Sequence, residues 1–271
     1  MMEVMKKILC PCDFSTPALR GIEYAADLCQ KINGNITLCH VQPSVWPEAI
    51  FLEPVVEESI ESAEDKLKVI ADGLTEKFGI KTQLLNPRST HTVEQTIGNL
   101  SEEFDLIVMG TNGLDDAFQF LFGSTAFNVA KLADCPVLIV PESCERLYPE
   151  GVVYVHHELV NPGLDILVPL WWAQLLNLDF GIWVMPTGND WTDQRLIKSI
   201  SDELKSDGTE ELINFVKTFP ESESELKTQN WIHAVAINHQ HFTGKSSGRR
   251  MLRKLTSTSN VPLLVFEVDA D

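Results

Sequence analysis

The sequence of 271 residues predicts an α/β protein made of two tandem domains. In the first half, short apolar runs alternate with segments of helical periodicity, which is typical of a parallel sheet covered on both faces. The second half repeats this order less clearly. The two halves also end alike, because the stretch 134–140 (DCPVLIV) resembles the stretch 260–266 (NVPLLVF). This similarity indicates a diverged internal duplication.

The first half contains five predicted strands with helices between them. Ser15 and Pro17 give the signals of a helix start just after the first strand. Asn33-Gly34 ends that helix, and Gly79 ends a long acidic helix. The predicted strands are Ile8–Cys12, Ile36–Val41, Ile80–Leu85, Leu106–Met109 and Val137–Val140, and the later helices are Glu57–Phe78, Thr92–Glu103 and Ser124–Ala133.

A polar segment with two prolines and a glycine, Pro141–Gly151, predicts a linker between the domains. We therefore place one domain at residues 1–143, the linker at 144–151 and a second domain at 152–271. An apolar helix around Trp171-Trp172 predicts core packing in the second domain, and an oligomer or partner surface stays open for part of it. The other elements expected there are the strands Val152–Val155, Phe180–Met185, Leu212–Val216, His233–Ile237 and Leu263–Phe266, and the helices Gln194–Leu204, Ser222–Lys227 and Arg249–Leu255.

Composition argues against several classes of partner. The net charge is −18 and both halves are acidic, so neither offers the basic surface that nucleic acid or an anionic membrane requires. The first residues lack the apolar run of a signal peptide, and the longest apolar stretch, Leu164–Leu178, is interrupted by polar residues. All six cysteines precede residue 150, mostly at predicted buried positions that suit reduced thiols. We expect a cytoplasmic protein with no nucleic-acid or membrane partner.

The most informative segment joins the fourth predicted strand to the next helix. The strand ends at Gly110, a second glycine follows at Gly113, and Gly123-Ser124 opens the helix. Glycine lets the backbone approach a ligand closely, and the free N–H groups of a helix start favour negative charge. Open parallel sheets bind ligands beyond the carboxyl ends of their strands, where the winding direction reverses. If the first and fourth strands are neighbours, Asp13 and Gly110 meet there, and the segment predicts a phosphate site.

This spacing, Gly-x2-Gly-x9-Gly-Ser, resembles the nucleotide-binding class of the universal stress protein family, and the likeness spans residues 5–141. The resemblance implies two Rossmann-like domains, related to the flavodoxin and adenine-nucleotide α-hydrolase folds. Each would have five parallel strands in the order 3-2-1-4-5, and the two would form an intramolecular pseudo-dimer through their last strands. It also implies an adenine nucleotide, ATP, as ligand. Asp13 and Val41 would hold its adenosine end, Met109 and Gly110 would form the floor, and Gly113, Gly123, Ser124 and Thr125 would take the phosphates.

Two features leave alternatives open at this site. Asp115 and Asp116 lie in the glycine loop, and they would repel a triphosphate unless Mg²⁺ intervenes or they point to solvent. We favour a solvated loop tip. The glycines also have an alternative role, which is a turn and a close helix–strand contact with no ligand.

Three functions compete on these grounds. The first is a nucleotide-responsive stress or regulatory protein with at most weak ATP hydrolysis, because no general base or arginine stands near the glycines. The second is an interaction module of the same fold that binds no nucleotide. The third, an α-hydrolase-type enzyme, ranks last because the segment after the first strand, Cys12–Pro17, lacks that group's glycine-rich loop.

The second half lacks a comparable motif. Its predicted strand His233–Ile237 ends without a glycine, so we expect no nucleotide there and a role as a built-in partner; a further homodimer stays open. His156-His157, His239 with His241, and Cys10 with Cys12 lack additional ligands at familiar spacings, which favours structural roles over metal binding. We predict no catalytic or metal-binding residue.

Overall fold

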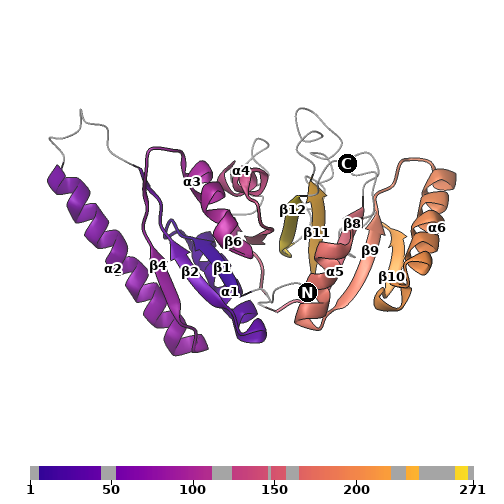
Figure 1. Cartoon of the computed structure of the whole chain (residues 1–271), viewed down its shortest axis with the longest axis horizontal. Helices are drawn as coiled ribbons and strands as arrows, with labels where there is room; N and C mark the ends of the chain where they lie inside the picture. The colour runs from indigo at the N-terminus through magenta and orange to yellow at the C-terminus, as the bar shows by residue number, and fades with distance from the viewer. Residues whose placement is uncertain are drawn as a thin grey trace. The chain divides into compact units, whose positions relative to one another are not determined.

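The computed structural model of the chain describes residues 6–43, 53–111, 124–145, 148–156, 165–220, 230–237 and 260–267 (Figure 1). The chain divides into two compact units, and the change from one to the other comes after Glu142. In each unit the described strands pair in parallel and helices pack against them. The predicted α/β class with mostly parallel strands is therefore confirmed.

The first unit is built around one parallel sheet with the strand order β4-β2-β1-β6-β7. Its strands are β1 (Lys7–Pro11), β2 (Asn35–Cys39), β4 (Thr82–Leu85), β6 (Leu106–Thr111) and β7 (Val137–Pro141). The chain moves from β1 through β2 to β4 on one side and from β6 to β7 on the other. The winding direction therefore reverses between β1 and β6, which are direct neighbours.

The helices of the first unit begin and end at signals that are local in sequence. They are α1 (Thr16–Ile32), α2 (Glu53–Phe78), α3 (Val93–Leu100) and α4 (Ser124–Leu132), with a 3-10 turn at Ser101–Glu103. The Ser15 hydroxyl accepts the backbone N–H of Ala18 at 3.3 Å, and Thr92 forms a capping box with Gln95. Asn33 and Gly79 take the left-handed backbone that ends a helix.

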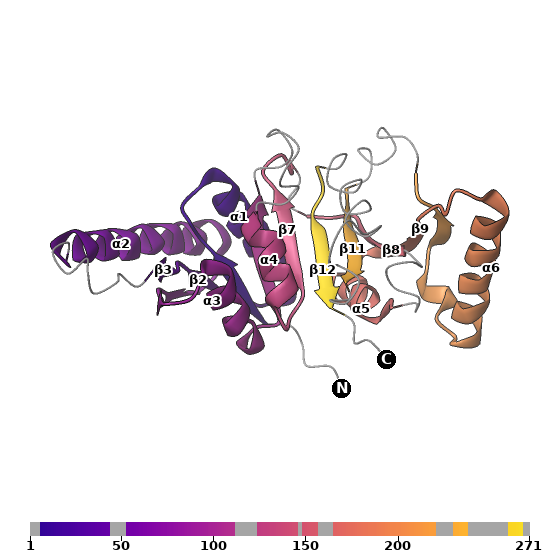
Figure 2. The ribbon, with the colours of Figure 1, turned by 90° about the horizontal axis from the view of Figure 1, so that it is seen from above.

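These helices cover the sheet of the first unit in two groups. The helix α1 packs against β1, β6 and β7, and α2 runs along the edge strand β4 (Figure 1). The helices α3 and α4 pack against each other and lie together in both ribbon views (Figure 2). The sequence did not predict two short strands, β3 (Gln42–Pro43) and β5 (Arg88–Ser89). They follow β2 and β4 in the sequence and pair with each other in parallel.

The second unit has the strand order β10-β9-β8-β11-β12. Its elements are β8 (Gly151–His156), α5 (Leu167–Leu176), β9 (Asp179–Val184), α6 (Asp190–Ser206), β10 (Phe215–Thr218), β11 (Trp231–Ile237) and β12 (Leu263–Glu267). Trp172 of α5 is fully buried, as its apolar surroundings predicted. The predicted helices Ser222–Lys227 and Arg249–Leu255 lie outside the described residues.

Several predicted boundaries were wrong. The helix α2 begins at Glu53 rather than Glu57, and β11 begins at Trp231 rather than His233. Two further errors in the second unit have a local cause. The helix α6 begins at Asp190 rather than Gln194, because the Asn189 side chain accepts the N–H groups of Trp191 and Thr192. The strand β10 begins at Phe215 rather than Leu212, because Glu210–Leu212 form a 3-10 turn. The apolar pattern had placed Leu212 in the strand, but in the structure it is an exposed residue of that turn.

Residues 148–150, at the end of the predicted linker, hydrogen-bond within the second unit. The Tyr148 hydroxyl donates to the carbonyl of Leu176 at 2.7 Å, and the Asn230 amide donates to the carbonyl of Tyr148 at 2.6 Å. The N–H of Glu150 donates to the carbonyl of Asn230 at 2.8 Å. The two bonds with Asn230 hold the entry to β8 against the start of β11, and the bond with Leu176 holds it against the end of α5.

The six cysteines all lie in described residues, and all are free thiols. Five are buried, and Cys135 is half-buried. Burial raises the pKa of Cys12 to about 11 and the pKa values of Cys29 and Cys39 to about 12, so these groups stay protonated at neutral pH. They pack as small apolar side chains. Among the described helices, none combines the length and apolar composition needed to cross a membrane.

Candidate functional site

The candidate site lies at the carboxyl ends of β1 and β6, where α1 lies directly on the backbone of Gly110. A Cβ atom added to Gly110 would lie 1.7 Å from the carbonyl oxygen of Pro17. A Cβ atom added to Gly21, one turn further along α1, would lie 2.6 Å from the Gly110 nitrogen. Only glycine permits so close an approach. The end of β6 and the turn that carries Asp13 are therefore held together at the point where the winding reverses.

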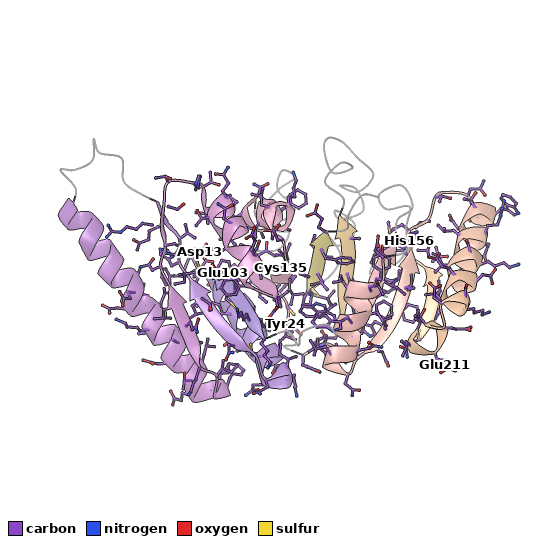
Figure 3. The ribbon with its side chains drawn as sticks, in the orientation of Figure 1. Asp13, Tyr24, Glu103, Cys135, His156 and Glu211 are labelled. Atoms are coloured by element: carbon purple, nitrogen blue, oxygen red, sulfur yellow. The ribbon has the colours of Figure 1, made fainter. Side chains whose placement is uncertain are left out.

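Asp13 follows β1 in this turn, and its side chain is exposed (Figure 3). Its Oδ1 atom accepts the backbone N–H of Ser15 at 3.0 Å and the Ser15 hydroxyl at 2.5 Å. The same hydroxyl accepts the N–H of Ala18 in the first turn of α1. Asp13 is thus tied to the helix start through Oδ1.

Phe14, the next residue, has a left-handed backbone with φ of 66°. Its ring centroid lies 4.7 Å from that of His40, which follows β2. The His40 Nδ1 atom lies 2.7 Å from the carbonyl oxygen of Cys12, and because a carbonyl only accepts, Nδ1 carries the proton. The Lys66 ammonium of α2 lies 5.4 Å from the centroid of the Phe14 ring. The sequence interpretation missed these three residues, since a left-handed phenylalanine has no local signal.

The other predicted site residues fall into two groups. Val41 is half-buried between β2 and β3, and Met109 is buried in β6 at 7% exposure. Ser124 opens α4 and Thr125 is half-buried in its first turn. Gly113, Gly123, Asp115 and Asp116 lie outside the described residues. The structure thus brings together the Asp13 turn and Gly110, while the proposed phosphate loop is described only from Ser124 onward.

Metal ligands do not gather anywhere in the described ranges, where no group of three or more histidine, cysteine, aspartate or glutamate side chains forms a candidate site. His156 ends β8 and is buried at 2% exposure (Figure 3). His157, His239 and His241 lie outside the described residues. The carboxyl edge of the first unit's sheet, which we call the rim, therefore offers backbone groups, the exposed carboxylates of Asp13 and Glu142 and an aromatic pair among its described residues.

Comparison with known proteins agrees with this architecture. Residues 5–141 match the model of the universal stress protein family. A universal stress protein of Methanocaldococcus jannaschii is 30% identical over 145 residues, which are 50% of this chain and 81% of that protein. One of Thermus aquaticus is 31% identical over 140 residues, 51% of this chain and 99% of that protein.

The solved structure of a universal stress protein from Archaeoglobus fulgidus resembles the whole chain. The TM-score is 0.70 at 18% identity, with 96% of this chain and 98% of that chain covered. This likeness shows the fold, and the sequence matches show the family. The chain therefore belongs to the universal stress protein family.

Proposed function

We propose that the first unit binds an adenine nucleotide, ATP or a close relative, and that the protein acts as a nucleotide-responsive stress or regulatory protein of the cytoplasm. The observation that carries the proposal is the pairing of β1 with β6, because the exposed Asp13 follows β1 directly. Parallel sheets bind ligands at such a switch point. Asp13 and Val41 would hold the adenosine end there, with the backbone of Met109 and Gly110 as the floor.

The phosphates would lie over the start of α4. A helix that follows a strand end presents free N–H groups and a partial positive charge, which favour an anion even in an acidic protein. Gly113, Gly123, Ser124 and Thr125 would form this cradle, with Mg²⁺ as an accompanying ion. We propose at most weak hydrolysis, because the described part of the rim presents no arginine or general base placed for phosphoryl transfer.

We further propose that the two units are tandem domains of one fold, with the second as a degenerate partner that binds no nucleotide. Two observations support this. The described strands of both units follow the same pairing pattern. A solved universal stress protein chain is also matched over nearly its whole length. The last strands of the two domains would pair as the two subunits of a dimer do, giving an intramolecular pseudo-dimer.

One observation favours the alternative function, an interaction module that binds no nucleotide. The packing of Pro17 on Gly110 already explains why glycine stands at that position. Substitution of a loop glycine such as Gly113 therefore distinguishes the two functions, whereas substitution of Gly110 does not.

The test begins with denaturing the purified protein and identifying any small molecule that it releases. Calorimetry with ATP on the wild type and on Gly113→Val then measures the site directly. We expect the variant to lose at least about tenfold in affinity, the loss of roughly one good ligand contact. Gly73→Ala is the matched control, because nothing lies within 4 Å of an added Cβ there. Unchanged affinity in Gly113→Val would refute this placement, and a wild type that ignores millimolar ATP would support the interaction module.

A further inference from the structure

The ring pair of Phe14 and His40 joins the two residues predicted to contact the nucleoside. We propose that Phe14 and His40 are positioning residues, which set the spacing between Asp13 and Val41 and so the recognition of the nucleoside. This inference rests on the proposed nucleotide site. Asp13 directly precedes Phe14 and Val41 directly follows His40, so the ring contact links the backbone positions next to the two predicted nucleoside contacts.

The left-handed backbone of Phe14 is the first observation that supports a positioning role for its ring. A bulky residue with φ of 66° is an outlier, and such strain persists only where the surrounding structure enforces it. The turn between β1 and α1 needs a left-handed residue, and glycine would provide it without strain. The chain has a phenylalanine instead, so the ring itself has a role at this position.

Contacts on both sides hold this ring pair in place. The His40 ring lies 4.7 Å from Phe14, and its Nδ1–H donates to the carbonyl of Cys12 at 2.7 Å. The N–H of Cys12 in turn donates to the carbonyl of Cys39 at 2.8 Å. Cys12 and Phe14, on either side of Asp13, are therefore joined to Cys39 and His40, just before Val41, by two hydrogen bonds and one ring contact.

A third element, α2, supports the same pair. The Lys66 ammonium lies 5.4 Å from the Phe14 ring, within the range of a cation–π contact. Lys66 is exposed, and among the described residues its ammonium group contacts the Phe14 ring. The turn is thus braced by β2 and by α2, and the direction of Asp13 depends on residues that need not touch the ligand.

A positioning role predicts a specific pattern of binding losses. Phe14→Gly keeps the left-handed backbone accessible but removes the ring, so Asp13 should lose its fixed direction. ATP affinity should fall about tenfold, which is within the usual coupling between contacting residues. Affinity for inorganic triphosphate should not change, because the phosphates would lie over α4. In an Asp13→Ala background, Phe14→Gly should lose clearly less ATP affinity than it does in the wild type, because only the Val41 contact is left to be displaced.

Two histidine variants separate the contacts, and they keep the test valid if Phe14→Gly does not fold. His40→Gln retains a donor for the Cys12 carbonyl without the ring, and His40→Phe retains a ring without the donor. Each should lose part of the ATP affinity, and thermal unfolding should show that both remain folded. His91→Ala, an exposed histidine at the start of α3, is the matched control and should bind as the wild type does.

Calorimetry on this set distinguishes the outcomes. The same loss for Phe14→Gly with and without Asp13, or an equal loss for triphosphate, overturns the positioning role and leaves the nucleotide site intact. A wild type that binds no ATP overturns the proposed function, and the positioning role with it. A loss that is confined to ATP and is clearly smaller in the Asp13→Ala background supports the inference.

Discussion

The two units follow the same strand order but differ at the end of the strand that precedes the last one. Equivalent positions can be read from matching hydrogen bonds. The N–H of Ile107 in β6 donates to the carbonyl of Pro136 at 3.0 Å, and the N–H of His233 in β11 donates to the carbonyl of Pro262 at 3.0 Å. His233 therefore stands where Ile107 stands in the first unit. Three residues later, Ala236 stands where Gly110 stands.

This single difference changes what the rim can hold. Gly110 lets the carbonyl of Pro17 lie against the β6 backbone, whereas the methyl group of Ala236 excludes a helix start at that distance. The connections differ accordingly, since α1 begins five residues after the end of β1 and α5 begins eleven residues after the end of β8. The short connection that carries Asp13 at the switch point belongs to the first unit. The nucleotide proposal is therefore confined to the first unit.

The largest expected effect comes from giving the first unit the alanine of the second. In Gly110→Ala the new methyl group would overlap the carbonyl of Pro17, a backbone atom that cannot move aside without shifting α1. We expect a loss of about 3 kcal/mol in the free energy of unfolding, the upper end for overpacking. Denaturant unfolding measures this loss. Ala236→Gly, the reverse exchange, should lose only about 1 kcal/mol, and similar losses for the two variants would contradict the equivalence.

The second prediction concerns His233, which is buried at 1% exposure and whose Nε2 atom has no hydrogen-bond partner among the described residues. The ring lies 5.2 Å from that of Trp183. Burial lowers the His233 pKa from 6.5 to about 3. Below pH 6.5 the unfolded chain therefore binds a proton that the folded chain does not. The free energy of unfolding consequently decreases as the pH is lowered from about 6.5 to about 3. At about 1.4 kcal/mol per pH unit, the loss from this group between pH 7 and pH 5 is about 2 kcal/mol.

Exchanging the equivalent residues tests this pH dependence. In His233→Ile the loss between pH 7 and pH 5 should shrink by about 2 kcal/mol relative to the wild type. Ile107→His should introduce a similar loss in the first unit, because Ile107 is also fully buried. Denaturant unfolding at both pH values gives the comparison. An unchanged difference between pH 7 and pH 5 in His233→Ile would show that the acid sensitivity comes from other groups.

Much of the fold was predictable because its signals are local. Ser15, Asn33, Gly79 and Thr92 each end or begin a helix through contacts with residues a few positions away. Asn189 gave the same kind of signal for α6, and the apolar pattern alone placed that start four residues too late. For β10 the apolar pattern placed the strand start too early. It assigned Leu212 to the strand, but Leu212 is an exposed residue of the preceding 3-10 turn.

The candidate site was predictable only in part. That Asp13 and Gly110 share a rim follows from strand order, because the carboxyl ends of parallel neighbours meet at one edge. The left-handed Phe14 and its contact with His40 depend on residues 26 positions apart, for which the sequence carries no periodic signal. The glycine pattern likewise could not show that Gly110 accommodates Pro17. A glycine permits the close approach of a ligand or of a helix, and the pattern does not distinguish the two.

The smallest expected effects come from the helix caps, and they test whether the two units unfold separately. In α3 the Thr92 hydroxyl accepts the N–H of Gln95 at 3.3 Å, and in α6 the Asn189 side chain accepts two N–H groups. Thr92→Ala and Asn189→Ala should each lose about 1 kcal/mol in the free energy of unfolding, whereas Thr92→Ser should lose little.

Calorimetric or denaturant unfolding then shows which transition each cap variant shifts. If the units unfold independently, Thr92→Ala lowers one midpoint and Asn189→Ala lowers the other, because each cap stabilises only the unit that contains it. If the units are coupled as the proposed pseudo-dimer requires, both variants shift one common transition by similar amounts. Two separate midpoints would therefore contradict the built-in partner role of the second unit while leaving the nucleotide site of the first untouched.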